Sequence, residues 1–339
     1  MRQQILCAVF VLTAASAFAQ TAPAAAPVAT PGPVVSVRNF IHTVADMDST
    51  VAFYQEVFGL KLRAPLGKPG TNASVNRLTD TGRATFRAAT FDIPGANVGF
   101  ELTEFTGVDR KPGRSGMRDP GNSMLNFRVK DIDATLAKAK KAGAEIITTG
   151  GEVLKRTNAQ TGASNRAIFL RDPDGFVLEM EQFYPEQPST APAGSAVLGA
   201  SIGMTASDAD ATAAFWKHFG VDVRLGMRNP GNATSMQLSA TENATFRGNA
   251  ATIPGTDFRW TIFEFTGIPR TPYMGRIQDP GTPALSLMVR DINAAMAAVK
   301  AAGARVVSVG GGPITMRAGQ PGGNVFLRDP DGFLFELIQ

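Results

Sequence analysis

The sequence predicts an α+β fold built from four copies of one unit, a strand followed by a helix and three more strands. Two observations support this prediction: the second half of the chain repeats the first, and each half holds two similar helix signatures. Ala84-Thr85-Phe86-Arg87 recurs 160 residues later as Ala244-Thr245-Phe246-Arg247, and the Glu-Phe-Thr-Gly sequence of residues 104–107 recurs at residues 264–267. Matches that keep one register over such a stretch indicate a duplicated domain.

Four helices are predicted from a shared start and stop signal. Each begins at a pair of acidic or amide residues, and a glycine follows 12 or 13 residues after the first of them. A short polar side chain at a helix start binds the exposed N–H groups, and a glycine past the end takes the left-handed conformation. We expect the second residue of each pair to be the cap. The sets are Asp46, Asp48 and Gly59; Asp131, Asp133 and Gly143; Asp208, Asp210 and Gly220; and Asp291, Asn293 and Gly303.

The strands are predicted around these helices. Residues 35–44 precede the first helix and are rich in β-branched and apolar residues, as expected for a strand. The Asp-Pro-Asp-Gly sequences of residues 172–175 and 329–332 predict hairpin turns between later strands. The repeated segment after residues 104 and 264 links one unit to the next, and we expect an ion pair in it between Glu104 and Arg110 and between Glu264 and Arg270.

The amino-terminal segment predicts export. Arg2, an apolar run over residues 5–11 and the small-residue sequence ending at Ala19 are typical of a signal peptide over residues 1–19. We therefore expect a periplasmic or secreted protein, cleaved near Ala19. The single cysteine, Cys7, lies in this segment, so the mature chain offers no thiol nucleophile, disulfide or thiolate metal ligand.

Two Ala/Pro-rich stretches predict the domain boundaries. Residues 20–34 form a tether, residues 185–195 form a linker, and the repeated domains then span residues 35–184 and 196–339. The formal net charge of +4 is scattered rather than clustered, which argues against nucleic acid as a partner and leaves small anions open. After signal cleavage no apolar run is long enough for stable membrane insertion.

The order and spacing of these motifs resemble the vicinal oxygen chelate superfamily, which includes glyoxalase I, bleomycin-resistance proteins and extradiol dioxygenases. The resemblance implies tandem domains, each of two βαβββ modules that form a curved mixed sheet around a cavity. It also implies a metal held by one inward residue from each first and last strand. The residues that carry the likeness are Val44-Ala45-Asp46-Met47, Phe53-Tyr54, Gly59-Leu60 and 169–175 leading to Glu179, with Asp208, Phe215-Trp216, Gly220 and 329–332 leading to Glu336 in the second half.

Transferred to this sequence, the implied metal positions are rich in oxygen ligands in the first half only. They fall on Asn39, Glu101, Met124 and Glu179, and in the second half on Ser201, Thr261, Ala284 and Glu336. Asn39, Glu101 and Glu179 suit Mg²⁺, Mn²⁺ or Ca²⁺ if any metal is bound, and the second set predicts no site. Strand alternation places further ligand-binding residues in the first cavity: Thr43, Thr103, Met124, Asn126 and Arg128.

The two histidines of the chain restrict the chemistry. His42 lies four residues before Asp46 and the ligand position lies seven before it, so His42 faces the other side of its strand and is expected to be packed. His218 lies near a helix end. A site with two histidines and a carboxylate, and a zinc site with nitrogen or sulfur ligands, are therefore both disfavoured.

Three functions stay open. The sequence favours an exported protein that binds a small organic molecule in a metal-poor cavity, as the drug-sequestering members of the superfamily do. The alternative is a divalent-metal-dependent lyase, isomerase or dioxygenase in which Glu101 and Glu179 are catalytic. The third is an interaction protein with a vestigial cavity. The sequence leaves open whether the modules pair within one chain or between two chains of a homodimer.

Overall fold

The computed structural model describes residues 32–158, 161–228, 233–253, 256–317, 319 and 322–339. The predicted signal peptide and residues 20–31 of the predicted tether lie outside the described residues. In the described part, no helix is long and apolar enough to cross a membrane. The elements of the first half are β1 (Val34–Thr43), α1 (Met47–Phe58), β2 (Lys61–Leu62), α2 (Ala73–Thr79), β3 (Thr85–Asp92), β4 (Gly99–Thr106), β5 (Ser123–Val129), α3 (Ile132–Lys141), β6 (Glu145–Ile146), β7 (Leu154–Thr157), β8 (Ser164–Arg171) and β9 (Val177–Tyr184).

The second half repeats this order with small differences. It begins at β10, directly after the predicted linker. Its elements are β10 (Val197–Ala206), α4 (Ala209–Lys217), β11 (Asp222–Arg224), α5 (Ala233–Ser239), β12 (Thr245–Thr252), β13 (Trp260–Thr266), β14 (Pro283–Val289), α6 (Ile292–Ala302), β15 (Arg305–Val306), β16 (Asn324–Arg328) and β17 (Leu334–Ile338).

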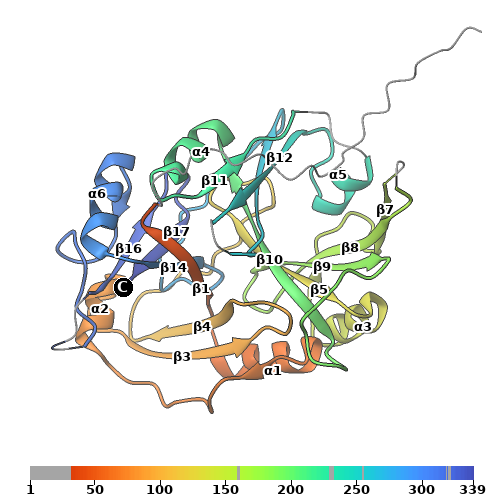
Figure 1. The fold of residues 1–339 in the computed structure, drawn as a ribbon. Helices are drawn as coiled ribbons and strands as arrows, with labels where there is room; N and C mark the ends of the chain where they lie inside the picture. Colours follow the sequence, from red (N-terminus) through yellow and green to blue (C-terminus); the bar gives the residue numbers. More distant parts are fainter. Residues whose placement is uncertain (1–31, 159–160, 229–232, 254–255, 318, 320–321) are drawn as a thin grey trace, which may run out of the picture. The chain divides into compact units, whose positions relative to one another are not determined.

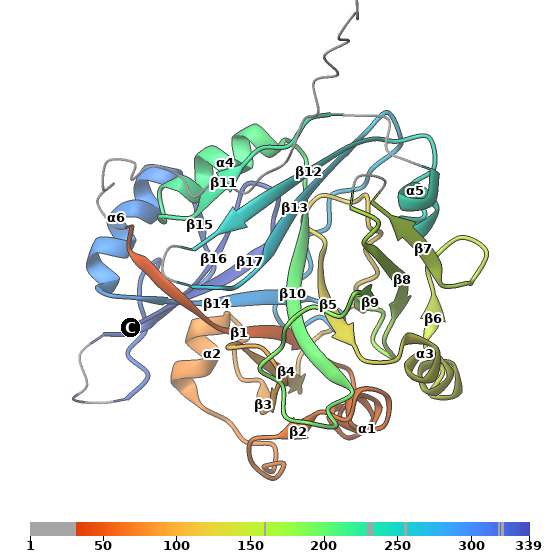
Figure 2. The same ribbon diagram turned by 45° about the vertical axis from the view of Figure 1, so that its right-hand side comes forward.

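The strands form two mixed sheets, and each sheet combines modules from both halves of the chain. Sheet A has the order β15-β16-β17-β14-β1-β4-β3-β2, and sheet B has the order β11-β12-β13-β10-β5-β9-β8-β6. The joins are the antiparallel pairs β1–β14 and β10–β5. In Figure 1 the red end of the chain, β1, lies beside the blue strand β14, and Figure 2 shows β10 beside β5. The predicted α+β class of two curved mixed sheets is confirmed, with the difference that the paired modules come from opposite halves.

The helix signals are confirmed, with one correction. The side chains of Asp46, Asp131, Asp208 and Asp291 accept the exposed N–H groups of α1, α3, α4 and α6. The first residue of each pair is therefore the cap, because it is the one with extended backbone, and the second lies in the first helical turn. The four predicted glycines all have positive φ. His218 is the C-cap residue of α4.

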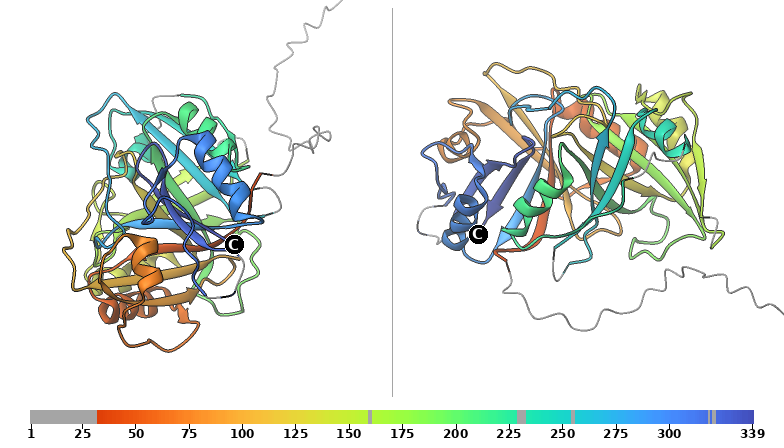
Figure 3. Two further views of the ribbon diagram at one scale, coloured as in Figure 1. Left: turned by 90° about the vertical axis from the view of Figure 1, so that its left-hand side faces the viewer. Right: turned by 90° about the horizontal axis from the view of Figure 1, so that it is seen from above.

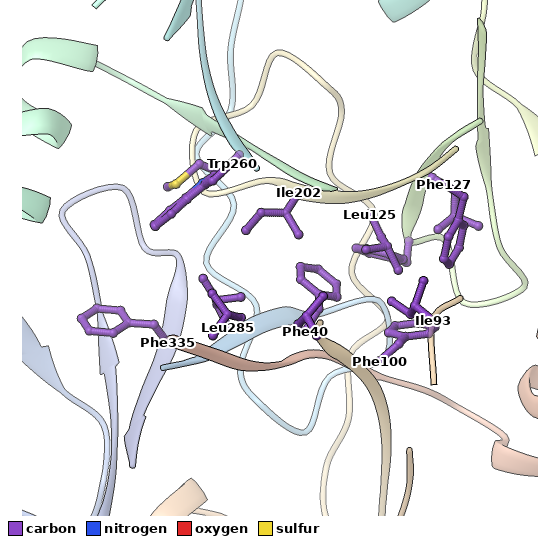
Figure 4. Packing of buried hydrophobic residues seen from close by; sticks show 14 of the residues in the cluster. Phe40, Ile93, Phe100, Leu125, Phe127, Ile202, Trp260, Leu285 and Phe335 are labelled. Carbon is purple, nitrogen blue, oxygen red and sulfur yellow. The ribbon is translucent and has the colours of Figure 1, made fainter. Parts of the chain in front are cut away.

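The main hydrophobic core lies between the two sheets. Figure 4 shows Leu125, Phe127, Ile202 and Trp260 of sheet B facing Phe40, Phe100, Leu285 and Phe335 of sheet A, and all eight are at most 2% exposed. Burial of this many large apolar side chains is the dominant favourable term in folding. It also joins the two halves, since both views in Figure 3 show the orange amino-terminal strands next to the blue carboxy-terminal ones.

The Asp-Pro-Asp-Gly turns connect the sheets as well as the strands of a hairpin. Asp174, after β8 of sheet B, accepts hydrogen bonds from the Ala45 N–H and the Thr50 hydroxyl at the start of α1, both at 2.7 Å. Asp331, after β16 of sheet A, accepts from Ser207 N–H and Thr212 at 2.9 and 3.0 Å. Sheet B therefore contacts the start of α1, which follows β1 of sheet A. Sheet A contacts the start of α4, which follows β10 of sheet B.

The expected ion pairs of the linking segments are wrong. Glu104 pairs with Arg87 at 2.6 Å and Glu264 pairs with Arg228 at 2.8 Å. The reason is strand register, which places Arg87 directly opposite Glu104 on the neighbouring strand. Arg110 and Arg270 instead donate to the carbonyls of Ala45 and Ser207, both at 3.1 Å.

Replacing Asp174 with alanine should lower the free energy of unfolding by about 2 kcal/mol, because the buried Thr50 hydroxyl and the Ala45 N–H lose their acceptor. The matched control is Asp133→Ala, which removes an exposed partner of Arg166 and should cost about 1 kcal/mol or less. Urea denaturation measures both. Equal losses in the two variants would show that the Asp174 contact does not hold the sheets together.

Candidate functional site

Each sheet lines a cavity on the face opposite the main core. Phe40 and Phe100 point into the core, so their neighbours Asn39, Ile41 and Glu101 point the other way. Cavity A, on sheet A, has a volume of about 200 Å³ and cavity B, on sheet B, about 300 Å³. The short helix α2 contributes to the wall of cavity A, and α5 contributes to the wall of cavity B.

Two glutamates line cavity A from opposite halves of the chain. The Asn39 amide donates to Glu101 at 2.7 Å. Glu336 accepts from the Ser286 hydroxyl at 2.5 Å and from the Asn324 amide at 2.7 Å. Asn39 and Ser286 are partners in the β1–β14 ladder. The cross-half strand pairing therefore places both carboxyl groups in one cavity.

The environment of cavity A favours the protonated form of both glutamates. Burial raises the pKa of Glu101, although Asn39 and the charges of Arg38 and Arg63 oppose the shift. Burial also raises the pKa of Glu336 to about 7, and the nearby Glu101 carboxylate adds to the shift. A carboxyl group with a pKa near neutrality can take up and release a proton under physiological conditions.

The donor atoms of cavity A fit a hard divalent cation. Asn39 Oδ1 is buried and has no hydrogen-bond partner among the described residues. Together with Glu101, Ser286 and Glu336 it forms an oxygen-only set, which suits Mg²⁺, Mn²⁺ or Ca²⁺ better than softer metals. A buried oxygen without a hydrogen-bond partner, such as Asn39 Oδ1, is a position where we expect a ligand to bind.

Cavity B has a single deeply buried glutamate. Asn126 donates to both Glu179 and Glu181 at 2.8 Å, and Arg156 pairs with Glu181 at 2.8 Å. Burial, reinforced by the Glu181 charge, raises the pKa of Glu179 well above its ordinary value. Ser201 completes the polar lining near these residues, and the result is a poorer set of metal donors than that of cavity A.

The structure does not bring together the two glutamates that we expected to share a site. Glu101 lies with Asn39 in cavity A, whereas Glu179 lies in cavity B. The physical reason is the exchange of modules between the halves, which separates β4 from β9. Glu336, which the sequence assigned to no site, takes the place opposite Glu101.

The other predicted residues divide between the two cavities. Thr103 lines cavity A, and Met124 and Asn126 line cavity B. Thr43 lies outside both linings because its hydroxyl donates to the Ile277 carbonyl at 2.6 Å. Arg128 lines an adjoining cleft.

Sequence reasoning missed two parts of the site. Ser286 of β14, two positions past the expected Ala284 on the same strand face, was not assigned to the site. The helices α2 and α5 were also missed. Asn72 caps α2 by accepting from the N–H groups of Ser74 and Val75, so a start signal for that helix is present in the sequence.

Comparison with known proteins decides the family. The model of the Glyoxalase/Bleomycin resistance protein/Dioxygenase superfamily matches residues 39–180 and 200–337. The chain belongs to this superfamily. The superfamily match covers both halves, and therefore both cavities.

Relatives within the superfamily are distant. A lactoylglutathione lyase of Arabidopsis thaliana is 28% identical over 151 residues, which cover 44% of this chain and 45% of that protein. The match thus spans less than half the length of this relative. A 2-epi-5-epi-valiolone epimerase of an Actinomyces species is 27% identical over 148 residues, 43% of this chain and 78% of that protein.

Solved structures of the superfamily share the fold. Glyoxalase I from Zea mays has a TM-score of 0.53 at 18% identity, covering 89% of this chain and 92% of that chain. A putative dioxygenase from Bacillus subtilis has a TM-score of 0.51 at 14% identity, covering 91% and 86%. At these identities the likeness concerns the fold alone.

A third polar cluster lies between the sheets, outside both cavity linings. His42 Nε2 is 2.8 Å from Asp172 Oδ2 and 3.9 Å from Asp174 Oδ2, and Tyr54 donates to Asp172 at 2.9 Å. The imidazole stacks on Phe176 with ring centroids 4.6 Å apart. The three donor atoms lie within 4.8 Å of one another and are a second candidate metal site. Because His42 is fully buried, this cluster is placed to connect the sheets and not to contact a substrate.

Replacing Glu336 with glutamine should alter how stability depends on pH. The folded protein holds a proton on Glu336 with a pKa of about 7, whereas the unfolded chain releases it near 4.5. The unfolded state therefore binds fewer protons between these values, and wild-type stability falls as pH rises through this window. Glutamine at this position takes up no proton, so the variant lacks this pH-dependent contribution to stability. The difference in melting temperature, variant minus wild type, should therefore be larger at about pH 8 than at about pH 5.

The control for this experiment is Glu56→Gln, which changes an exposed carboxyl group. It should follow the wild-type melting curve at both pH values, measured with chelator present. Parallel pH profiles for wild type and Glu336→Gln would contradict a raised pKa at Glu336.

Proposed function

We propose that this protein binds a small organic molecule in cavity A and catalyses a proton transfer on it, as a divalent-cation-dependent lyase or isomerase. The single observation that carries the proposal is the meeting of Glu101 and Glu336 in one cavity. The assignment keeps Glu101 and Asn39 from the sequence prediction and replaces Glu179 by Glu336.

The residues of cavity A divide into two roles. Asn39, Glu101 and Ser286 would hold a divalent cation, which when bound supplies Lewis acidity to a substrate carbonyl oxygen. Glu336 removes a proton from the carbon next to that carbonyl and returns it to a neighbouring position, because its pKa near 7 allows both steps. The substrate is isomerised without net oxidation or reduction.

The rest of cavity A suits a small ligand. Its volume of about 200 Å³ is enclosed partly by the apolar side chains of Ile41, Phe105 and Phe326. An apolar wall with a few convergent polar groups is typical of small-molecule sites. The names of the two relatives, a lyase and an epimerase, support this class of reaction over oxygenation.

A second candidate function is binding without turnover. It is favoured by the neutral hydrogen-bond donors that already engage Glu101 and Glu336, and by the lack of histidine in the linings of cavities A and B among the described residues. For either function we propose action in the periplasm or outside the cell, on the basis of the signal-like sequence of residues 1–19.

Manganese binding and proton exchange test the proposal together. We expect purified full-length protein to bind about one equivalent of Mn²⁺, measured by electron paramagnetic resonance. We also expect it to incorporate deuterium from D₂O into members of an α-hydroxyketone panel, followed by proton NMR. Glu101→Gln should lose both properties, and Glu336→Gln should lower exchange by about 100-fold or more.

Two controls make this test specific. Glu179→Gln changes the repeat counterpart of Glu336 in cavity B and should keep both properties. His42→Asn should keep the exchange activity, and loss of Mn²⁺ in this variant alone would place the ion in the cluster between the sheets. Ligand-induced thermal stabilisation without any exchange would overturn the enzymatic proposal in favour of binding.

A further inference from the structure

A cleft lined by two arginines adjoins cavity B. The cleft has a volume of about 340 Å³, and residues 187–190 of the segment between the two halves form part of its wall. Asn126, Glu181, Ser201 and Arg259 line both the cleft and cavity B, so the two spaces are neighbours. A ligand that extends from one to the other can therefore touch both.

Two guanidinium groups face this cleft without a carboxylate partner. In the described part of the chain, neither Arg128 nor Arg259 forms an ion pair. Arg128 donates to the Leu198 carbonyl at 2.5 Å and to Gln187 at 3.4 Å, but its buried Nε has no partner among the described residues. Burial and the nearby charge of Arg259 both lower the pKa of Arg128. Like charges held together and a buried unpaired donor are costly unless an anion joins them.

No acidic group nearby forms an ion pair with either arginine among the described residues, although the charge of Glu186 acts on Arg128. Glu181 is paired with Arg156 at 2.8 Å, and Glu186 is paired with Lys130 at 2.5 Å. Burial and the charge of Glu181 raise the pKa of Glu179, and Arg156 opposes this shift. Asp257 is the one further acid in the cleft lining, and it is exposed.

Cavity B also has an apolar part. Met117, Phe169 and Phe263 line it, together with Met236 and Leu238 of α5. In sheet A the repeat counterparts of Arg128 and Arg259 are Met288 and Gly99. The arginine pair of cavity B is thus not repeated at the same positions of sheet A.

We propose that cavity B and its cleft bind a small organic acid, with the carboxylate between Arg128 and Arg259 and the apolar body against Phe169 and Phe263. A carboxylate matches the fork geometry of guanidinium groups and gives strong, charge-assisted hydrogen bonds. This site is separate from the reaction proposed for cavity A, and it makes the two cavities of one chain different in ligand and role.

Calorimetric titration with a matched pair of probes tests the site. The acids 1-naphthaleneacetate, 4-phenylbutyrate and decanoate should include at least one that binds the full-length protein. The neutral amide of that acid should bind at least about tenfold more weakly than the acid. Arg259→Gln, which alters an exposed side chain, should cost a similar factor, and Arg128→Lys should weaken binding because it keeps the charge but loses the fork.

Two control variants separate this site from cavity A. Arg224→Gln removes an exposed arginine from the edge of the same sheet and should bind the acid as wild type does. Glu101→Gln should also bind it normally, even if it abolishes the reaction proposed for cavity A. The proposal is overturned if no acid binds, if acid and amide bind equally, if Arg259→Gln binds as wild type, or if Glu101→Gln alone loses the acid.

Discussion

The antiparallel pairing of β1 with β14, and of β10 with β5, decides which side chains meet in this protein. Each pair joins the first strand of one half to a central strand of the other half. The other strands of each module lie in the same sheet as the first strand of that module. Asn39 and Glu101 are therefore placed with Ser286 and Glu336, and Asn126 and Glu179 with Ser201. The chemistry of both cavities depends on this exchange.

Contacts at the helix starts and in the core hold the exchanged modules in place. The carboxylates of Asp174 and Asp331 each reach the helix start that belongs to the other sheet. Between the sheets, His42 and Asp172 lie against a packed layer of aromatic rings. The carboxylates of Asp172, Asp174 and Asp331 all accept hydrogen bonds. The two ring nitrogens of His42 have no hydrogen-bond partner among the described residues. Buried polar groups of this kind specify one arrangement of the modules better than apolar packing alone.

Duplication followed by divergence has left the two cavities with different charges. Cavity A holds two carboxyl groups whose pKa values are raised, and its donor atoms are all oxygens. Cavity B holds one such group, and the charge of its second glutamate is balanced by Arg156. The arginines of the adjoining cleft have no counterparts in sheet A. The same backbone therefore carries the proton-transfer site that we propose on one side and the anion site that we propose on the other.

The sequence by itself determined the four modules, the acidic pairs and glycines that bound their helices, and the α+β class, because these depend on local periodicity, capping and turn chemistry. It also identified Asn39 and Glu101 as neighbours, since both lie in one module. Only the tertiary structure decided that Glu336, and not Glu179, faces Glu101. Partner choice between nearly identical modules depends on long-range strand pairing and on core packing between sheets, and neither leaves a local pattern in the sequence.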